Sequence, residues 1–231
     1  MNLRSLCPAF MFPILQRAAA LPDIFLFSFF KLTTKPDPKG VLTVSPSRDE
    51  LSGNHAFIIK ELEGSEFKVS HLFECDCKNR IKRLKALAQN GIILLDDYTK
   101  FIYPLTFPKT TKVIQVWHST GAFKRMGFAR MGRRGSTVAT SLTHRNYTHV
   151  IVSSKGVTEN FCEAFGLSSD KIYPIGVPRT DLFFPKKKSK KYAILFTVNT
   201  PLSKTKSLYF LLPHSGVIPV KRHTILTSGL I

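Results

Sequence analysis

Residues 113–121 of the chain read VIQVWHSTG. The branched valine and isoleucine side chains in the first half of this stretch are typical of a buried strand. His118 then opens a loop, residues 119–128, that contains two glycines and the adjacent cations Lys124 and Arg125. Because glycine lets a backbone approach a ligand closely, the stretch predicts a histidine at the end of a strand, beside a basic loop suited to an anion.

The rest of the chain alternates strand-like and helix-like segments. Continuous apolar runs of strand length, separated by amphipathic stretches, favour an α/β fold in which helices cover both faces of a parallel sheet. Such sheets bind ligands beyond the carboxyl ends of their strands, where His118, Ser153 and Gly176 are expected. We expect strands at residues 40–45, 67–73, 92–95, 113–117, 150–153 and 172–175, and helices at about 54–62, 79–90 and 157–165.

The formal net charge of +19 is unevenly distributed, since no acidic residue occurs between Tyr98 and Thr158. Such a surface attracts phosphate, and charge alone does not choose among a lipid diphosphate, a nucleotide, an anionic membrane and a nucleic acid. Nothing resembles a DNA-reading helix or an aromatic stacking platform, so we expect no nucleic-acid partner. The basic residues of this span are Lys100, Lys109, Lys112, Lys124, Arg125, Arg130, Arg133, Arg134, Arg145 and Lys155.

Cysteine and histidine spacing gives no sign of a metal site. The four cysteines include no Cys-x-x-Cys pair, and Cys75 and Cys77 are too close together for an ordinary zinc half-site. His144 and His149 have no third ligand nearby in the sequence. We therefore expect reduced thiols, no metal ion and no cofactor.

The first 35 residues are apolar but interrupted. Prolines at positions 8, 13 and 22, with Arg17 and Asp23, break every apolar run before it reaches the roughly 20 residues of a membrane-spanning helix. A charged residue and prolines within the apolar run also argue against a signal peptide. The segment is predicted to face a membrane surface or a partner, and an ordinary helix that covers a sheet edge is the equal alternative.

Three motifs in order resemble a known family. They are WHSTG at residues 117–121, NYTHVIVSS at 146–154 and EAFGLSSDKIYPIGVPRTD at 163–181. Together they are similar to the CDP-glycerol and CDP-ribitol phosphotransferases that build wall teichoic acid in Gram-positive bacteria, and more to primase-like members than to polymerases. The resemblance is clearest over residues 110–185, weaker over 40–110, and absent after about Thr197.

The resemblance implies a Rossmann-like parallel sheet that forms the amino-terminal, acceptor-side half of a two-domain GT-B-type fold. We expect a membrane-associating segment at 1–35, the acceptor-side domain at 36–182, a basic linker at 183–191 and an incomplete donor-binding domain at 192–231. The last 50 residues contain no acidic side chain, which is unusual for a folded domain. A truncation or a change of reading frame near Thr197 would explain this composition.

In the family reaction, an acceptor hydroxyl attacks the β-phosphorus of a CDP-alditol and releases CMP. The motif match makes His118 the expected base, because an imidazole with a pKa near 6.5 suits proton removal at neutral pH. The alternative is a strand-end histidine that is hydrogen-bonded to backbone.

The remaining candidate residues would bind substrate or phosphate. Ser119 and Thr120 could equally be turn formers, and Arg179 could equally form a structural pair with Asp181. Arg130, Arg133 and Arg134 form a basic, glycine-containing loop suited to a lipid-linked diphosphate or to the membrane face. The substrate-binding and phosphate-binding candidates are Ser119, Thr120, Gly121, Lys124, Arg125 and Arg179.

The implied function is transfer of polyol phosphate from CDP-glycerol or CDP-ribitol to an undecaprenyl-diphosphate-linked saccharide. The protein would act peripherally at the cytoplasmic face of the membrane, with an anionic membrane surface as a further partner. The alternative is an inactive acceptor-domain remnant that binds anionic lipid or a partner and transfers nothing.

Overall fold

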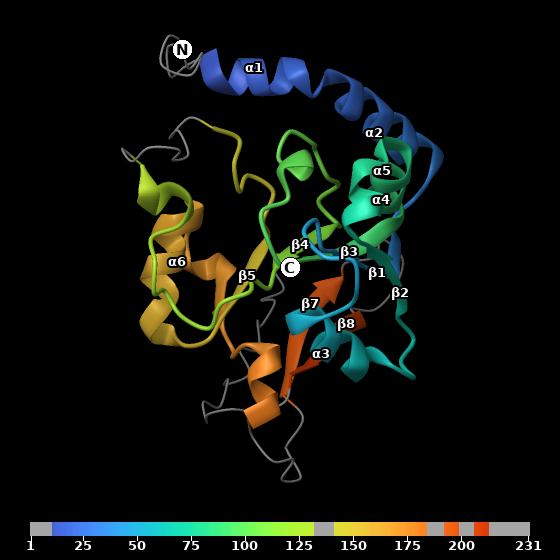
Figure 1. Ribbon diagram of the computed structural model, residues 1–231. Helices are drawn as coiled ribbons and strands as arrows, with labels where there is room; N and C mark the ends of the chain where they lie inside the picture. The colour runs from blue at the N-terminus through green and yellow to red at the C-terminus, as the bar shows by residue number, and fades with distance from the viewer. Residues whose placement is uncertain (1–10, 132–140, 184–191, 199–205, 213–231) are drawn as a thin grey trace, which may run out of the picture.

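A computed structural model describes residues 11–131, 141–183, 192–198 and 206–212 of the chain. Within them lies a six-stranded sheet in which every pair of neighbours is parallel, with strand order β2-β1-β3-β4-β5-β6 (Figure 1). The strands are β1 (Asp37–Val44), β2 (Lys68–Leu72), β3 (Asn90–Leu95), β4 (Lys112–Gln115), β5 (His149–Val152) and β6 (Ile172–Pro174). All six strands were predicted from sequence, and the α/β, Rossmann-like fold class is confirmed.

Helices cover both faces of the sheet, as the apolar strands require. Each central strand sends alternate side chains to opposite faces, so that Ile93 and Leu95 of β3 lie in one apolar cluster and Ile92 and Leu94 lie in the other. The first cluster packs against α2 (Leu21–Thr33), α5 (Arg80–Gln89) and α6 (Thr158–Phe165). The second packs against α3 (Gly53–Leu62). With helices packed on both faces of this parallel sheet, the carboxyl ends of the strands, where candidate residues are expected, lie along one edge of the sheet.

The chain order of the strands reverses between β1 and β3. From β1 the chain passes through α3 to β2 on one side, and then through α4 (Glu74–Lys78) and α5 to β3 on the other. A doubly wound sheet has its ligand crevice at such a switch point, beyond the carboxyl ends of the strands. Ser45, which follows β1, and Asp96, which follows β3, both lie at this point.

The amino-terminal helices α1 (Phe12–Ala19) and α2 run along one side of the molecule (Figure 1). One face of α2 packs on α5, where Phe27 is buried and Asp23 forms ion pairs with Arg80 and Arg83. Large apolar side chains on both helices remain exposed. They are Ile14 and Leu15 on α1 and Leu21, Phe25, Phe29 and Leu32 on α2. The segment therefore has a feature of each alternative: one face of α2 packs on the core, and other apolar side chains of α1 and α2 are exposed to solvent.

None of the helices in the described part of the chain has the length and apolar character needed to cross a bilayer.

Beyond the six-stranded sheet, β7 (Tyr192–Val198) and β8 (Lys206–Leu212) form an antiparallel pair, and β8 lies alongside α3 (Figure 1). Both strands lie in the segment where an incomplete donor-binding domain is expected, and β8 in particular was not expected from sequence. The basic linker at 184–191 and the arginines Arg133 and Arg134 lie outside the described residues. The division into domains stays a prediction.

Short helical turns complete the described chain. They are η3 (Lys100–Ile102), η4 (Gly127–Arg130), η5 (Lys155–Val157), η6 (Ser169–Lys171) and η7 (Pro178–Phe183). Of these, η4 and η7 carry residues of the predicted basic loop and of the GVPRTD motif.

Candidate active site

Trp117 follows β4, two residues beyond its last residue, and has a left-handed conformation with φ of +51°. For a bulky residue this conformation costs about 1–2 kcal/mol, so the surrounding structure must impose it. The indole is 2% exposed and makes edge contacts with Tyr98 and Phe165, at centroid distances of 5.2 and 5.4 Å. The side chain therefore stays in the core while the backbone turns sharply away from the sheet.

Two buried amides hold this turn. The Oε1 atom of Gln115 accepts the main-chain N–H of Trp117 at 2.9 Å. The Nδ2 atom of Asn54, in the first turn of α3, donates to the carbonyls of Val116 (3.1 Å) and Trp117 (2.7 Å). Both peptide groups of Trp117 thus bond to side chains at the point where the strand ends, which offsets the strain of its backbone.

The turn places His118 across the end of β3. Its Nδ1 atom lies 2.9 Å from the main-chain oxygen of Asp96. Because a carbonyl oxygen only accepts, Nδ1 carries the proton in this contact, and in the neutral ring the lone pair is then on Nε2. The ring also stacks on the indole of Trp117, with centroids 4.2 Å apart and planes 27° apart. A strand-end histidine that is hydrogen-bonded to backbone was the alternative to a base, and this hydrogen bond is present. The same bond favours the tautomer with the lone pair on Nε2, which is the tautomer that a base requires.

A cluster of polar side chains contacts the buried carboxylate of Asp96. This carboxylate accepts a hydrogen bond from Ser45 Oγ at 3.1 Å and forms an ion pair with Arg48 Nε at 3.3 Å. Burial raises the pKa of Asp96, against the opposing effect of Arg48. The neighbouring His55 lies 3.1 Å from Ser45 Oγ through Nδ1, and burial lowers its pKa to about 3, so that His55 is neutral at physiological pH. The cluster ties the ends of β1 and β3 together next to His118.

The loop after His118 begins with a local turn, because Ser119 Oγ donates to the carbonyl of Gly121 at 3.1 Å. This is the turn-forming alternative for Ser119. Thr120 is half-buried beside it. A Cβ atom at Gly121 would lie 2.8 Å from the ring of Phe123, an exposed side chain that is free to move. The backbone of Gly121 therefore does not require glycine.

Gly127 is the glycine that the loop does require. Its φ is +51°, and a Cβ atom there would lie 2.0 Å from the carbonyl oxygen of Ala164 in α6. Its N–H donates to Tyr98 Oη at 2.9 Å, and the Tyr98 ring in turn contacts Trp117. The Gly127 end of the loop is therefore held against α6 and, through Tyr98, against Trp117.

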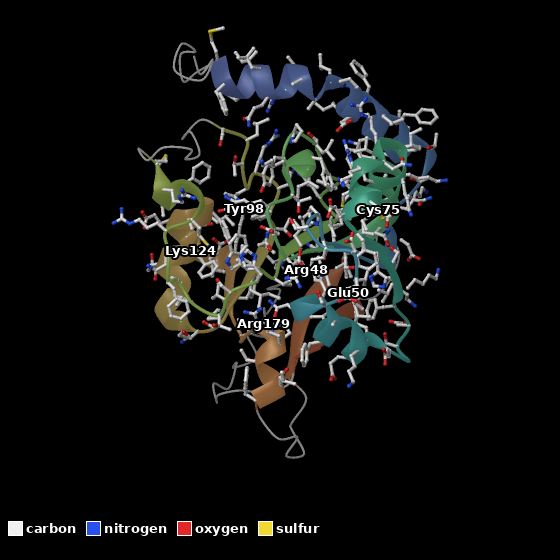
Figure 2. All side chains as sticks on the ribbon, in the orientation of Figure 1. Arg48, Glu50, Cys75, Tyr98, Lys124 and Arg179 are labelled. Atoms are coloured by element: carbon white, nitrogen blue, oxygen red, sulfur yellow. The ribbon has the colours of Figure 1, made fainter. Side chains whose placement is uncertain are left out.

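The candidate cations differ in how they are held. Lys124 and Arg125 are exposed, and neither forms an ion pair with any carboxylate in the described ranges. Arg179 is half-exposed at the start of η7, and its main-chain N–H donates to Asn54 Oδ1 at 3.2 Å. Asn54 therefore joins the third sequence motif to the first. In Figure 2, Arg179 lies beside α3, whereas Lys124 lies on the side of the molecule where α6 lies.

The predicted structural pair between Arg179 and Asp181 does not form: the ion pairs among the described residues do not include it. Burial, with a smaller effect from Glu61, raises the pKa of Asp181 to about 6. One of its oxygens is buried without a hydrogen-bond partner. This carboxyl therefore takes up a proton closer to neutral pH than an ordinary aspartate does, and it does so without an ion pair to Arg179.

Comparison with known proteins supports the motif resemblance. The family described as CDP-Glycerol:Poly(glycerophosphate) glycerophosphotransferase matches residues 26–210, which extends past Thr197. Teichoic acid poly(ribitol-phosphate) polymerase of Bacillus spizizenii is 32% identical over 197 residues, which are 82% of this chain and 32% of that protein. Teichoic acid glycerol-phosphate primase of Bacillus subtilis is 26% identical over 189 residues, 71% of this chain and 48% of that protein. Both polymerases and primases are thus relatives, and the primase-like subdivision stays a prediction.

The fold is similar to that of the wall teichoic acid polymerase TagF, with a TM-score of 0.54 at 16% identity. The match covers 74% of this chain and 49% of the polymerase chain. A structure of a variant of that polymerase soaked with CDPG gives a TM-score of 0.55. The chain thus spans about half of the TagF structure and about a third of the Bacillus spizizenii polymerase.

With the family match over most of its length, and with relatives among both polymerases and primases, the chain belongs to the CDP-glycerol:poly(glycerophosphate) glycerophosphotransferase family of teichoic acid biosynthesis.

Proposed function

We propose that the chain provides the acceptor side of a polyol-phosphate transferase site in which His118 is the general base. The acceptor hydroxyl attacks the β-phosphorus of CDP-glycerol or CDP-ribitol, and its proton moves to Nε2 of His118. A new oxygen–phosphorus bond forms, the bond to the CMP oxygen breaks, and CMP leaves. The observation that carries the proposal is the hydrogen bond from Nδ1 to the Asp96 carbonyl, which in the neutral imidazole puts the lone pair on Nε2.

Positive charge around His118 supports a diphosphate substrate. Lys124 and Arg125 extend from the loop that follows it, and Arg179 is tied to the same backbone turn through Asn54. Charge builds up on the leaving phosphate during transfer, so cations placed beside the base lower the barrier. Ser119, Thr120 and Gly121 line the start of that loop and complete the proposed phosphate-binding set.

The acceptor in this proposal is an undecaprenyl-diphosphate-linked saccharide, reached from the cytoplasmic face of the membrane. The exposed apolar side chains of α1 and α2 support a peripheral position, since Leu21, Phe25, Phe29 and Leu32 recur at helical spacing along α2. Arg17, in the last turn of α1, suits anionic headgroups, whereas Lys31 donates to the main-chain carbonyl of Thr106.

The test is release of CMP from CDP-glycerol and from CDP-ribitol by the purified chain, with a lipid-diphosphate disaccharide as acceptor. His118→Gln should lower the rate by about 100-fold or more, because general-base catalysis contributes about 10²–10⁴-fold. His149→Gln is the matched control, because His149 is the first residue of β5, whereas His118 follows the carboxyl end of the neighbouring strand β4. This variant should retain the wild-type rate.

Equal rates for His118→Gln and the wild-type chain would refute the base. Absence of CMP release from the wild-type chain, with binding of the acceptor retained, would support the alternative in which the fold binds the acceptor and transfers nothing by itself. Restoration of release by a separately supplied donor-binding domain would then assign the missing activity to that domain.

A further inference from the structure

Asn54 connects three separate segments of the chain at the carboxyl edge of the sheet. It is 3% exposed, and its amide is used fully by long-range contacts. Nδ2 donates to the carbonyls of Val116 and Trp117, and Oδ1 accepts the main-chain N–H of Arg179. These partners are 62, 63 and 125 residues away in sequence.

The chemistry of these three contacts selects an amide. Two carbonyls need donors and one N–H needs an acceptor, within the reach of a single short side chain. A carboxylate offers no donor, and a hydroxyl offers only one. Asparagine at the first turn of α3 meets all three requirements and leaves no buried polar atom of its own unpaired.

We propose that Asn54 is a positioning residue for His118. It holds Trp117 in the left-handed conformation, and that conformation carries the imidazole to the carbonyl of Asp96. Through Oδ1 it also fixes the backbone of Arg179 against the same turn. Asn54 thereby fixes the position of the proposed base relative to the GVPRTD motif. This inference rests on the proposed role of His118, but its central claim is about geometry.

The chain contains a reporter of that geometry. Trp117 is its single tryptophan, so intrinsic fluorescence comes from the residue that Asn54 holds and on which His118 stacks. The ¹⁵N chemical shifts of the imidazole distinguish a proton on Nδ1 from a proton on Nε2. They therefore report whether His118 keeps its bond to Asp96, and a His118→Gln spectrum identifies the signal. Neither measurement needs catalytic turnover.

The decisive variant is Asn54→Asp, which keeps the size of the side chain and the acceptor for Arg179 but removes both donors. The matched control is Asn146→Asp. Asn146 also donates from Nδ2 to main-chain carbonyls, among them that of Leu105 at 2.9 Å, in a segment that does not include His118. A general loss of stability would lower Tm in both variants.

We expect Asn54→Asp alone to shift Trp117 emission to longer wavelength and to change the tautomer signal of His118. Where the wild-type chain releases CMP, kcat of this variant should fall by about 100-fold with little change in KM, because misplacement of a catalytic group by about 1 Å has that effect. Unchanged emission and tautomer signals in Asn54→Asp would overturn the proposal, as would equal changes in Asn146→Asp.

If Asn54→Asp does not fold, as judged by circular dichroism, Asn54→Ser provides the same comparison without an added charge and with one donor in place of two. It should show the same spectral changes, and wild-type spectra from a folded Asn54→Ser would overturn the proposal. Failure of the wild-type chain to release CMP would count against transfer by this chain alone and would leave the spectroscopic result to decide the role of Asn54.

Discussion

Two glycines with a positive φ differ in how much stability an added side chain would cost. Gly64 has φ of +75° and no atom within 4 Å of a built Cβ, whereas Gly127 has φ of +51° and a main-chain oxygen at 2.0 Å. Gly64→Ala should lower the free energy of unfolding by about 1 kcal/mol, the conformational cost alone. Gly127→Ala should lower it by about 3 kcal/mol or more, because the backbone of α6 must move.

Urea denaturation of the two variants checks this prediction, with the slope of the transition compared as well as its midpoint. Similar losses for both alanines would show that the loop anchored by Gly127 adjusts without strain and is not held against α6 as described.

The residues of the candidate site differ in how far sequence could reveal them. His118 was predictable because a strand pattern ends directly before it. Asp96 also follows a predicted strand, at 92–95, so the same rule applied to every strand end would have found it. Asn54 leaves no local pattern, since its role depends on partners more than 60 residues away. Left-handed Trp117 was equally hidden, because no propensity places a tryptophan there.

At the level of elements, α2 has two apolar faces with different surroundings. One face packs on α5, and the other exposes Phe25, which is 71% accessible. If the exposed face lies on an anionic membrane, Phe25→Asp should weaken binding to phosphatidylglycerol vesicles by about tenfold or more, because burial of one aromatic side chain contributes about 1.5–3 kcal/mol. Phe183→Asp is the matched control, since Phe183 has similar exposure on η7.

Vesicle sedimentation at several salt concentrations checks the prediction, with phosphatidylcholine vesicles as a neutral reference. The overall positive charge of the chain gives a salt-sensitive contribution in every variant. If Phe25→Asp and Phe183→Asp bind the vesicles equally well at salt concentrations that screen this electrostatic contribution, then α2 is not part of the membrane-facing surface.

The central strands β1, β3 and β5 were predictable because each carries a run of apolar residues that is buried in the sheet, whereas the edge strand β2, with the sequence KVSHL, is only partly buried. Other elements were not predictable. The helix α4 has five residues, too few for a periodic signal. The pairing of β7 with β8 joins two segments whose composition gave no sign of a hairpin.

At the level of the whole molecule, buried histidines make the fold sensitive to acid. Burial lowers the pKa of both His55 and His144 to about 3, from an ordinary value of 6.5. The unfolded chain therefore binds more protons than the folded chain between these values, and stability rises with pH across that window. Their contribution is complete above about pH 6.5 and is lost progressively as the pH falls toward 3.

His144→Asn should make this dependence shallower. His144 has φ of +64°, which asparagine tolerates, and its ring lies among Tyr98, Tyr147 and Phe165 without a hydrogen bond to either nitrogen. The absolute stability of the variant should fall because the cavity is not refilled. The measurement is the free energy of unfolding in urea from pH 4 to 8. An unchanged slope in the variant would show that His144 does not carry the acid sensitivity.

The strand order also sets when the site becomes complete during synthesis. After β1, β2 and β3 have paired, β4, β5 and β6 each join the same growing edge of the sheet, in the order in which the ribosome delivers them. The contacts that Asn54, Asp96 and Gln115 make with Trp117 and His118 all lie within residues 54–118. The nascent chain therefore contains these hydrogen-bonding partners before β5 is translated, while the packing of Phe165 on Trp117 and the Arg179 contact with Asn54 are added later.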